Sequence, residues 1–210
     1  MIATIIRIES AGPERRARRL VFDQGLEPRE TSAAALKALG LVEGVAVDSQ
    51  RLEADLQAIE GDLAKVRALQ LLGYRERCEA ELTRKLIATG YSSAIARSVV
   101  QRYVEVELVD DRRFATAFAR IRVAAGYGDR RIARELADKG VPEELALEAL
   151  EGLHESGDEA ARARRALRGR VARDRREADK LVRRLVSRGF SVSVALQALE
   201  VDTEDVSNEE

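Results

Sequence analysis

From Arg51 onward, apolar side chains recur at spacings of three and four residues, which is the period of an α-helix with one buried face. The first run extends from Leu52 to Leu69, and Gly73 ends it. Further runs follow in the same manner and are separated by short links that contain glycine. The pattern predicts nine helices in three groups of three, so the expected fold class is all-α in the main.

One segment of this helical region occurs three times, at residues 84–101, 134–151 and 183–200. The copies align without a gap, and a leucine, a glycine and the apolar residue after the glycine coincide in all three. These positions are Leu86, Leu136 and Leu185, then Gly90, Gly140 and Gly189, then Tyr91, Val141 and Phe190. A fixed period of this size is typical of one repeated supersecondary unit. Stacked units present an elongated binding surface rather than an enzyme pocket.

The three repeated glycines each follow the last apolar residue of a predicted helix. A glycine at that position adopts a left-handed backbone at little cost and ends the helix. A phosphate-binding loop needs several glycines together with a lysine and a hydroxyl residue in one loop. We therefore expect these glycines to be helix C-caps rather than ligand contacts.

The first fifty residues differ from the rest of the chain. Short β-branched or apolar runs alternate with turn residues, and Thr31 or Ser32 can cap a short helix that Gly40 ends. A unit this small is marginal alone, so it either leans on the helical body or is mobile. The predicted strands are residues 2–8, 19–22 and 45–47.

These patterns predict a tandem array of three three-helix repeats with a small N-terminal β-containing segment. We expect the array to be a monomer. The expected domains are an α+β segment at 1–50, helical repeats at 51–107, 108–156 and 157–201, and an acidic tail at 202–210.

The composition excludes several classes of protein. The chain has one cysteine, Cys78, and one histidine, His154. One cysteine cannot form an internal disulfide, and we expect no site for a soft metal ion because too few cysteine and histidine ligands are present. We also find no nucleophile–base pair, and therefore expect no catalytic residues, no metal and no cofactor. Cys78 is predicted to be a small core residue and His154 a surface residue. No apolar run reaches the length of a membrane span or a signal peptide, which favours a cytoplasmic protein without a membrane partner.

Charge is unevenly distributed, although the net charge is only −1. Between Arg162 and Arg188, twelve basic residues face three acidic ones, a local net charge of +9. Arginine is suited to bidentate contact with phosphate or carboxylate, so this run could bind a polyanion. The alternative is a solvated helix face whose arginines pair with neighbouring acidic segments. The candidate filament or DNA contacts are Arg162, Arg165, Arg168, Arg173, Arg176, Lys180 and Arg184.

A pair of aspartates, Asp110 and Asp111, precedes the first helix of the second repeat. Adjacent carboxylates at a helix start point in different directions, and no further metal ligand follows at a suitable spacing. Aspartate is a preferred N-cap, so we expect capping rather than catalysis. Phe114 begins the apolar face of the same helix, and we expect it in the core.

Several of these residues resemble sequence motifs of a known protein family. Residues 108–115 (LVDDRRFA), with Gly126 and residues 131–132, 135–136 and 139–141, resemble the central signature of the bacterial RecX regulators. Leu181, Leu185 and residues 188–190 resemble that family's C-terminal motif, and residues 81–91 resemble its first-repeat version. The likeness covers about residues 60–200, whereas the N-terminal segment matches only loosely. The signature positions, mostly structural, are Asp110, Asp111, Phe114, Ala115, Gly126, Gly140, Gly189 and Phe190.

The resemblance implies three tandem three-helix repeats and a regulator of DNA recombination, DNA repair and the SOS response. It implies that the chain is no enzyme and binds RecA and the RecA–DNA filament, limiting filament growth, ATP hydrolysis and strand exchange. It also implies weaker direct binding to single- or double-stranded DNA. The alternative function is a stand-alone DNA-binding protein that uses the basic third repeat. Few aromatic residues lie near the arginine run, so sequence-specific readout of single strands is not expected.

Overall fold

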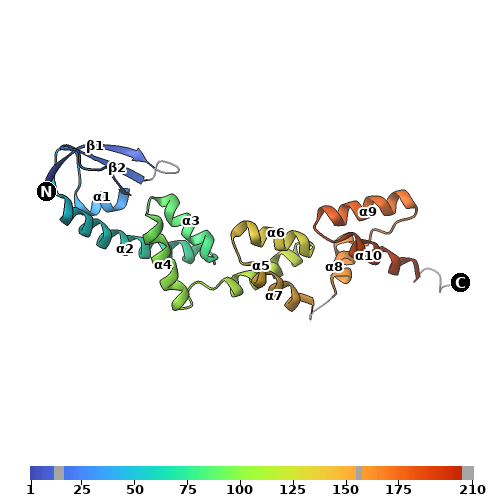
Figure 1. The fold of residues 1–210 in the computed structure, drawn as a ribbon. Coiled ribbons are helices and arrows are strands. Elements are labelled where there is room, and N and C mark those ends of the chain that lie inside the picture. Colours follow the sequence, from blue (N-terminus) through green and yellow to red (C-terminus); the bar gives the residue numbers. More distant parts are fainter. Residues whose placement is uncertain (12–16, 155–157, 205–210) are drawn as a thin grey trace. The chain divides into compact units, whose positions relative to one another are not determined.

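The structure is a computed structural model that describes residues 1–11, 17–154 and 158–204 of the 210-residue chain (Figure 1). The chain divides into two compact units, Met1–Asp110 and Asp111–Glu210. The described residues form ten helices and one four-stranded sheet, so the mainly all-α prediction is confirmed. The first unit holds the sheet and helices α1 to α4, and the second holds α5 to α10.

The sheet of the first unit is antiparallel throughout, with strand order β3-β2-β1-β4. Its strands are β1 (Ile2–Ala11), β2 (Ala17–Phe22), β3 (Arg29–Ser32) and β4 (Ala46–Asp48). The sequence pattern predicts three of these strands but not β3. That strand reads Arg-Glu-Thr-Ser and has no apolar alternation, because it lies at the edge of the sheet and pairs only with β2.

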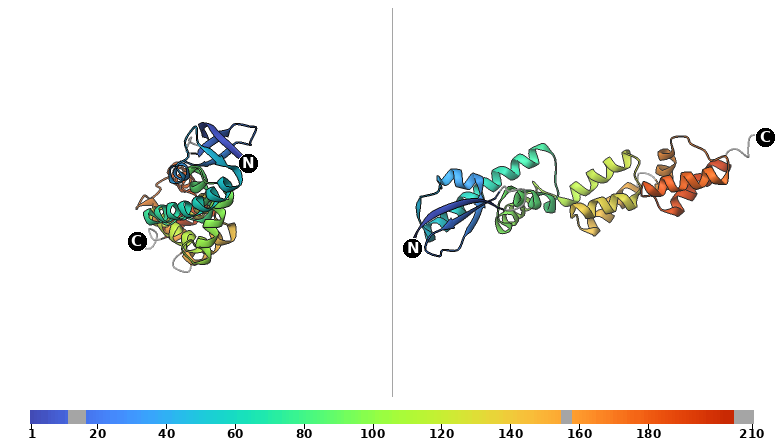
Figure 2. Two further views of the ribbon diagram at one scale, coloured as in Figure 1. Left: turned by 90° about the vertical axis from the view of Figure 1, so that its left-hand side faces the viewer. Right: turned by 90° about the horizontal axis from the view of Figure 1, so that it is seen from above.

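The sheet lies against α1 (Ala33–Leu39) and the N-terminal part of α2 (Ser49–Tyr74), as both ribbon views show (Figures 1 and 2). Ile5, Leu20, Leu36 and Leu52 belong to one buried cluster between them. The buried Glu60 of α2 also accepts hydrogen bonds from the Thr31 hydroxyl at 2.5 Å and the Ser32 backbone N–H at 2.9 Å. The N-terminal segment therefore leans on the helical body, the first of the two alternatives.

The rest of α2 packs with α3 (Glu79–Thr89) and α4 (Ser93–Glu105) as the first three-helix repeat. The four-residue spacing of Cys78, Leu82 and Leu86 predicts a second helix that starts near residue 75, but α3 begins only at Glu79. The reason is Arg77, which is buried, donates from Nε to the Leu71 carbonyl at 3.2 Å and forms an ion pair with Glu81. Cys78 is fully buried, as predicted, but in the residue before the helix rather than on its face.

The second unit contains two further groups of three helices. The second repeat comprises α5 (Asp111–Ala124), α6 (Asp129–Lys139) and α7 (Glu143–His154). The third comprises α8 (Glu159–Leu167), α9 (Arg175–Ser187) and α10 (Val192–Glu204).

Buried side chains at the repeated positions hold both groups together. Phe114 is 5% exposed, as expected for a core residue, and Ala115 and Leu136 are fully buried. Leu185 and Phe190 belong to the core of the third repeat. The repeated glycines have the predicted left-handed backbone, with φ of 111° at Gly90, 90° at Gly140 and 95° at Gly189.

Candidate functional site at the junction of the second and third repeats

The second and third repeats meet through their backbones. The N–H of Gly128 donates to the Arg188 carbonyl at 3.0 Å, and the N–H of Arg130 donates to the Gly189 carbonyl at 3.1 Å. Unpaired N–H groups at the start of α6 are thus satisfied by carbonyls that follow α9. A Cβ on Gly128 would lie 2.4 Å from the backbone nitrogen of Phe190, so the contact requires glycine at that position.

A buried ion pair reinforces this junction. Arg162 of α8 is 6% exposed, and its Nη2 lies 2.8 Å and 3.0 Å from the two carboxylate oxygens of Asp129. The backbone N–H of Asp129 in turn donates to Glu159 Oε1 at 3.0 Å. Arg162 therefore holds the third repeat to the start of α6. The charge pattern suggests that Arg162 is exposed. The residue is buried instead, because it lies with Ala163 and Ala166 on the face of α8 that packs against other helices.

The remaining candidate residues lie at the surface. Arg165, Arg168, Arg173, Arg176 and Lys180 are exposed, and Arg184 is half-buried. Within the described ranges, none of the six forms an ion pair with a carboxylate. The alternative of a salt-bridged helix face therefore has no support in the described part of the chain.

The charges are concentrated around the segment between α8 and α9. Arg168 ends α8 with a left-handed φ of 54°, and α9 starts only at Arg175. The sequence pattern predicts a helix break only near residues 173 and 174, so the observed break is longer than expected. The positive charge of Arg170, partial burial, and the charges of Arg188 and Arg168 together lower the pKa of Arg184 below its usual value. A guanidinium resists losing its proton, so the lowered pKa reports mutual repulsion between these arginines rather than deprotonation.

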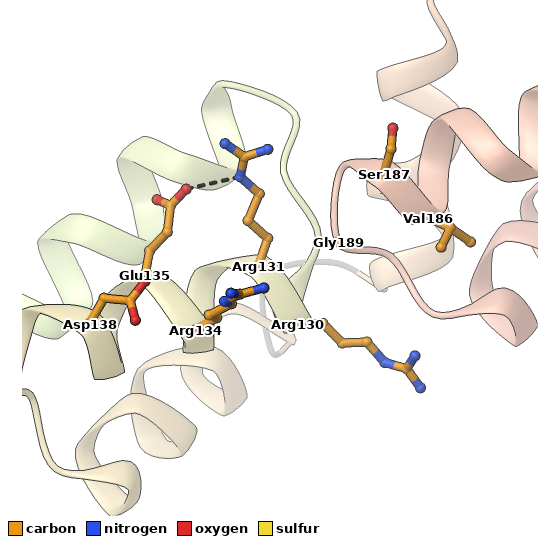
Figure 3. Close-up of a pocket in the computed structure, with 8 residues that line it drawn as sticks. All are labelled: Arg130, Arg131, Arg134, Glu135, Asp138, Val186, Ser187 and Gly189. Carbon is orange, nitrogen blue, oxygen red and sulfur yellow. Dashed lines mark hydrogen bonds and ion pairs between the residues drawn. The ribbon is translucent and has the colours of Figure 1, made fainter.

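A second basic group lies on α6, outside the arginine run of the third repeat. Arg130, Arg131 and Arg134 are exposed and line a cavity of ≈ 510 Å³ with Glu135, Asp138 and the end of α9 (Figure 3). Arg131 Nε pairs with Glu135 Oε1 at 2.9 Å, whereas Arg130 extends away from that pair (Figure 3). The signal in the sequence is the Asp-Arg-Arg run after Gly128, which is short beside the run in the third repeat.

Aromatic rings accompany this second group. The Arg131 guanidinium lies 4.2 Å from the ring centroid of the half-buried Tyr127, and that of Arg122 lies 5.5 Å from it. Arg122 also lies 5.0 Å from the centroid of the Phe118 ring. These cation–π contacts and the ion pairs to Glu135 occupy Arg122 and Arg131 internally. Arg131 is consequently less available to a partner than the third-repeat arginines, whereas Arg130 and Arg134 take no part in these contacts.

Other kinds of site are not apparent where the structure can be searched. No cluster of histidine, cysteine or carboxylate side chains suited to a metal ion occurs among the described residues. None of the helices described is long and apolar enough to cross a bilayer. Asp110 lies directly before α5 and Asp111 is buried in its first turn, so the two carboxylates do not share an open pocket.

Comparison with known proteins gives a consistent result. The model of the first three-helix domain of RecX matches residues 64–102, and that of the second matches residues 110–150. The regulatory protein RecX of Mycolicibacterium vanbaalenii is 37% identical over 173 residues, which cover 77% of this chain and 92% of that protein. The regulatory protein RecX of Halorhodospira halophila is 37% identical over 140 residues, covering 66% of this chain and 87% of its own length.

The fold agrees with these matches. A crystal structure of regulatory protein RecX superposes with a TM-score of 0.60 at 22% identity, over 93% of this chain and 98% of the other. Sequence and fold together show that this chain belongs to the RecX family of regulatory proteins.

Proposed function

We propose that this chain binds RecA or RecA–DNA filaments and inhibits or modulates the recombinase by occupying the filament, without chemistry of its own. Membership of a family of regulatory proteins supports the proposal. The observation that carries it is the exposed arginine surface of the third repeat. The side chains of Arg165, Arg168, Arg173 and Arg176 have no carboxylate partner in the described part of the chain.

A RecA–DNA filament is a suitable partner for such a surface. Its DNA supplies regularly spaced phosphates, which unpaired arginines bind through charge-assisted hydrogen bonds. Tandem repeats place several weak contacts on one chain, and linked contacts gain affinity through effective concentration. A chain bound in this way would obstruct the motion between RecA subunits that ATP turnover and strand exchange require.

The same proposal places the chain among proteins of DNA repair, recombination and the SOS response. RecA acts on the chromosome, so the site of action in a bacterium is the cytoplasm. We propose that the chain acts as a monomer, since apolar side chains are buried within each repeat and the tandem repeats already supply several contacts.

Co-sedimentation tests the proposal directly. Purified chain is centrifuged with RecA filaments on single-stranded DNA, with RecA alone and with DNA alone, and the RecA ATPase rate is measured in parallel. We expect strong co-sedimentation only with the assembled filament and a falling ATPase rate as the chain is added. Equal recovery with and without RecA, and an unchanged ATPase rate, would reject the proposal.

The stand-alone DNA-binding function is the second candidate, and the same unpaired arginines favour it. Measuring the affinity of the chain for bare DNA over a range of salt concentrations distinguishes the two candidate functions. Direct neutralisation of phosphates makes the logarithm of the binding constant fall by about 0.9 per phosphate contact for each unit of log salt concentration. Tight, steeply salt-dependent binding to bare DNA without any effect on RecA would favour the second candidate.

A further inference from the structure

A smaller cavity lies on the other side of the Gly126–Tyr127–Gly128 link, between the end of α5, α8 and the end of α9. Its volume is ≈ 200 Å³, and four arginines, Arg162, Arg165, Arg168 and Arg188, line it together with small apolar residues. Among the described residues, its lining contains neither a carboxylate nor an aromatic ring. A water molecule occupies about 30 Å³ of liquid, so the cavity has room for one small polyatomic anion.

The buried arginine in this lining has unused donors. Only Nη2 of Arg162 reaches Asp129, and its Nε and Nη1 have no hydrogen-bond partner among the described atoms. The side chain is 6% exposed, so water reaches these groups poorly. Buried polar groups almost always have a partner, and an unpaired one in a native structure calls for an explanation such as a bound ion.

The other three arginines are also weakly engaged. Arg188 Nη1 reaches the Gly126 carbonyl only at 3.5 Å, and Arg165 Nε reaches the Ala161 carbonyl at 3.4 Å. No hydrogen bond from the Arg168 side chain occurs to any described residue. The mutual repulsion around Arg184 shows that further positive charge lies close by. An anion in the cavity would supply the acceptors and remove this repulsion.

We propose that this cavity binds one phosphate group of a nucleic-acid backbone, held by Arg162, Arg165, Arg168 and Arg188. The identification of the source as a nucleic acid rests on the proposed function. The arginine fork matches phosphate oxygens bidentately. The absence of aromatic side chains from the lining disfavours a nucleotide held by its base, whereas the exposed Arg173, Arg176 and Lys180 of the same repeat can contact further phosphates.

The site has a structural consequence because its wall comes from both repeats. Gly126 belongs to the second repeat, and Arg162, Arg168 and Arg188 belong to the third. All four arginines that hold the phosphate belong to the third repeat, and the second repeat supplies small apolar residues of the wall. Binding therefore reduces the repulsion between these arginines, beside the Arg162–Asp129 pair that joins the two repeats.

The test measures binding of pyrophosphate and of a short oligothymidylate to the full chain by calorimetry at constant ionic strength. Arg168→Gln and Arg188→Gln each remove one guanidinium from the cavity, and Arg183→Gln removes an exposed charge of α9 that does not line it. We expect both probes to bind about tenfold more weakly to the two cavity variants, and less than twofold more weakly to the control. Arg188→Lys, which keeps the charge but loses the fork, is expected to bind between these limits.

Equal weakening in all three glutamine variants, or no binding of either probe to the unaltered chain, would overturn the proposal. An acidic peptide of poly-glutamate distinguishes the source, and binding tighter than that of the oligothymidylate would also overturn it. Thermal melting of each variant without ligand verifies that its junction is intact. RecA filament co-sedimentation is measured separately. A variant that no longer binds phosphate but still binds filaments supports the proposed phosphate site, and it leaves the proposed filament function to be judged by its own test.

Discussion

Asp129 and Arg162, 33 residues apart in the chain, form a buried ion pair that joins the second helical repeat to the third. Both repeats otherwise bury apolar side chains of their own, and the backbone hydrogen bonds of Gly128 to Arg188 and of Arg130 to Gly189 bring them together. The junction therefore combines three features: a buried charge pair, a glycine without room for a side chain, and an arginine-lined cavity.

Asp129→Ala is expected to destabilise the chain by about 3–5 kcal/mol, because it leaves the buried Arg162 charge without a counter-ion. Urea denaturation followed by circular dichroism measures the change. The exposed pair of Arg112 and Glu148 provides the control, and Glu148→Ala is expected to cost at most about 1 kcal/mol. Similar losses in the two variants would contradict the structural role of the Asp129–Arg162 pair.

Gly128→Ala is expected to weaken the junction, because the added methyl group would lie 2.4 Å from the Phe190 nitrogen. Gly152, within α7, is the matched control, since a Cβ there meets nothing within 4 Å. Gly152→Ala is expected to stabilise the chain by up to about 1 kcal/mol, because alanine has the higher helix propensity. A melting temperature that rises in both variants would show that the repeats do not approach as described.

Phe114→Ala is expected to cost about 3–5 kcal/mol, the usual range for emptying a buried aromatic site. Chemical denaturation measures this loss. Phe114 packs near Phe118, whose ring centroid lies 6.0 Å away, so part of the cost comes from that ring. A variant that keeps its stability but no longer acts on filaments would instead make Phe114 a contact residue.

Asp48 gives the first unit a dependence on pH. Its side chain caps α2 by accepting from the backbone N–H groups of Gln50 and Arg51, and the Arg51 hydrogen bond is the main cause of a pKa below the usual value. A lowered carboxyl pKa contributes stability above the unfolded value of about 3.9, and the contribution is lost as pH falls through the folded value. Asp48→Asn keeps a cap but not the charge.

Asp48→Asn should therefore be less stable than the unaltered chain at neutral pH, and the difference should shrink as the pH falls below about 3.9 and through the lowered pKa of folded Asp48. Thermal melting across this pH range measures the difference. A gap between the two proteins that is independent of pH would contradict the capping role of the charge.

The helices could be predicted because their apolar period and terminal glycines are local signals. The start of α3 could not, because it depends on the buried pairing of Arg77 with Glu81 and on the Leu71 carbonyl. Strand β3 was missed because an edge strand of polar residues has no periodic pattern. These failures share a cause, since each element is decided by contacts with residues that a local pattern does not include.

The candidate site was predictable only as a charge excess. Composition indicates a basic third repeat, but the helical phase that buries Arg162 and exposes Arg165 depends on how α8 packs. The roles of Gly128 and Asp129 are not visible in the sequence, because their partners Phe190 and Arg162 lie far along the chain.

The central claim is that the exposed arginines of the third repeat bind the RecA–DNA filament. The most direct test replaces Arg165, Arg168 and Arg176 together by glutamine, which nearly preserves helix propensity. The control replaces Arg7, Arg19 and Arg51 of the first unit by glutamine, which removes the same charge from exposed, ion-paired positions.

Affinity for RecA filaments on single-stranded DNA is measured over a range of salt concentrations. The account predicts weaker binding and a flatter salt dependence for the third-repeat variant. The log–log slope should fall by about 0.7 for each phosphate of the single strand that the variant no longer neutralises. The control is predicted to bind like the unaltered chain. Unchanged affinity and slope in the third-repeat variant would contradict the account.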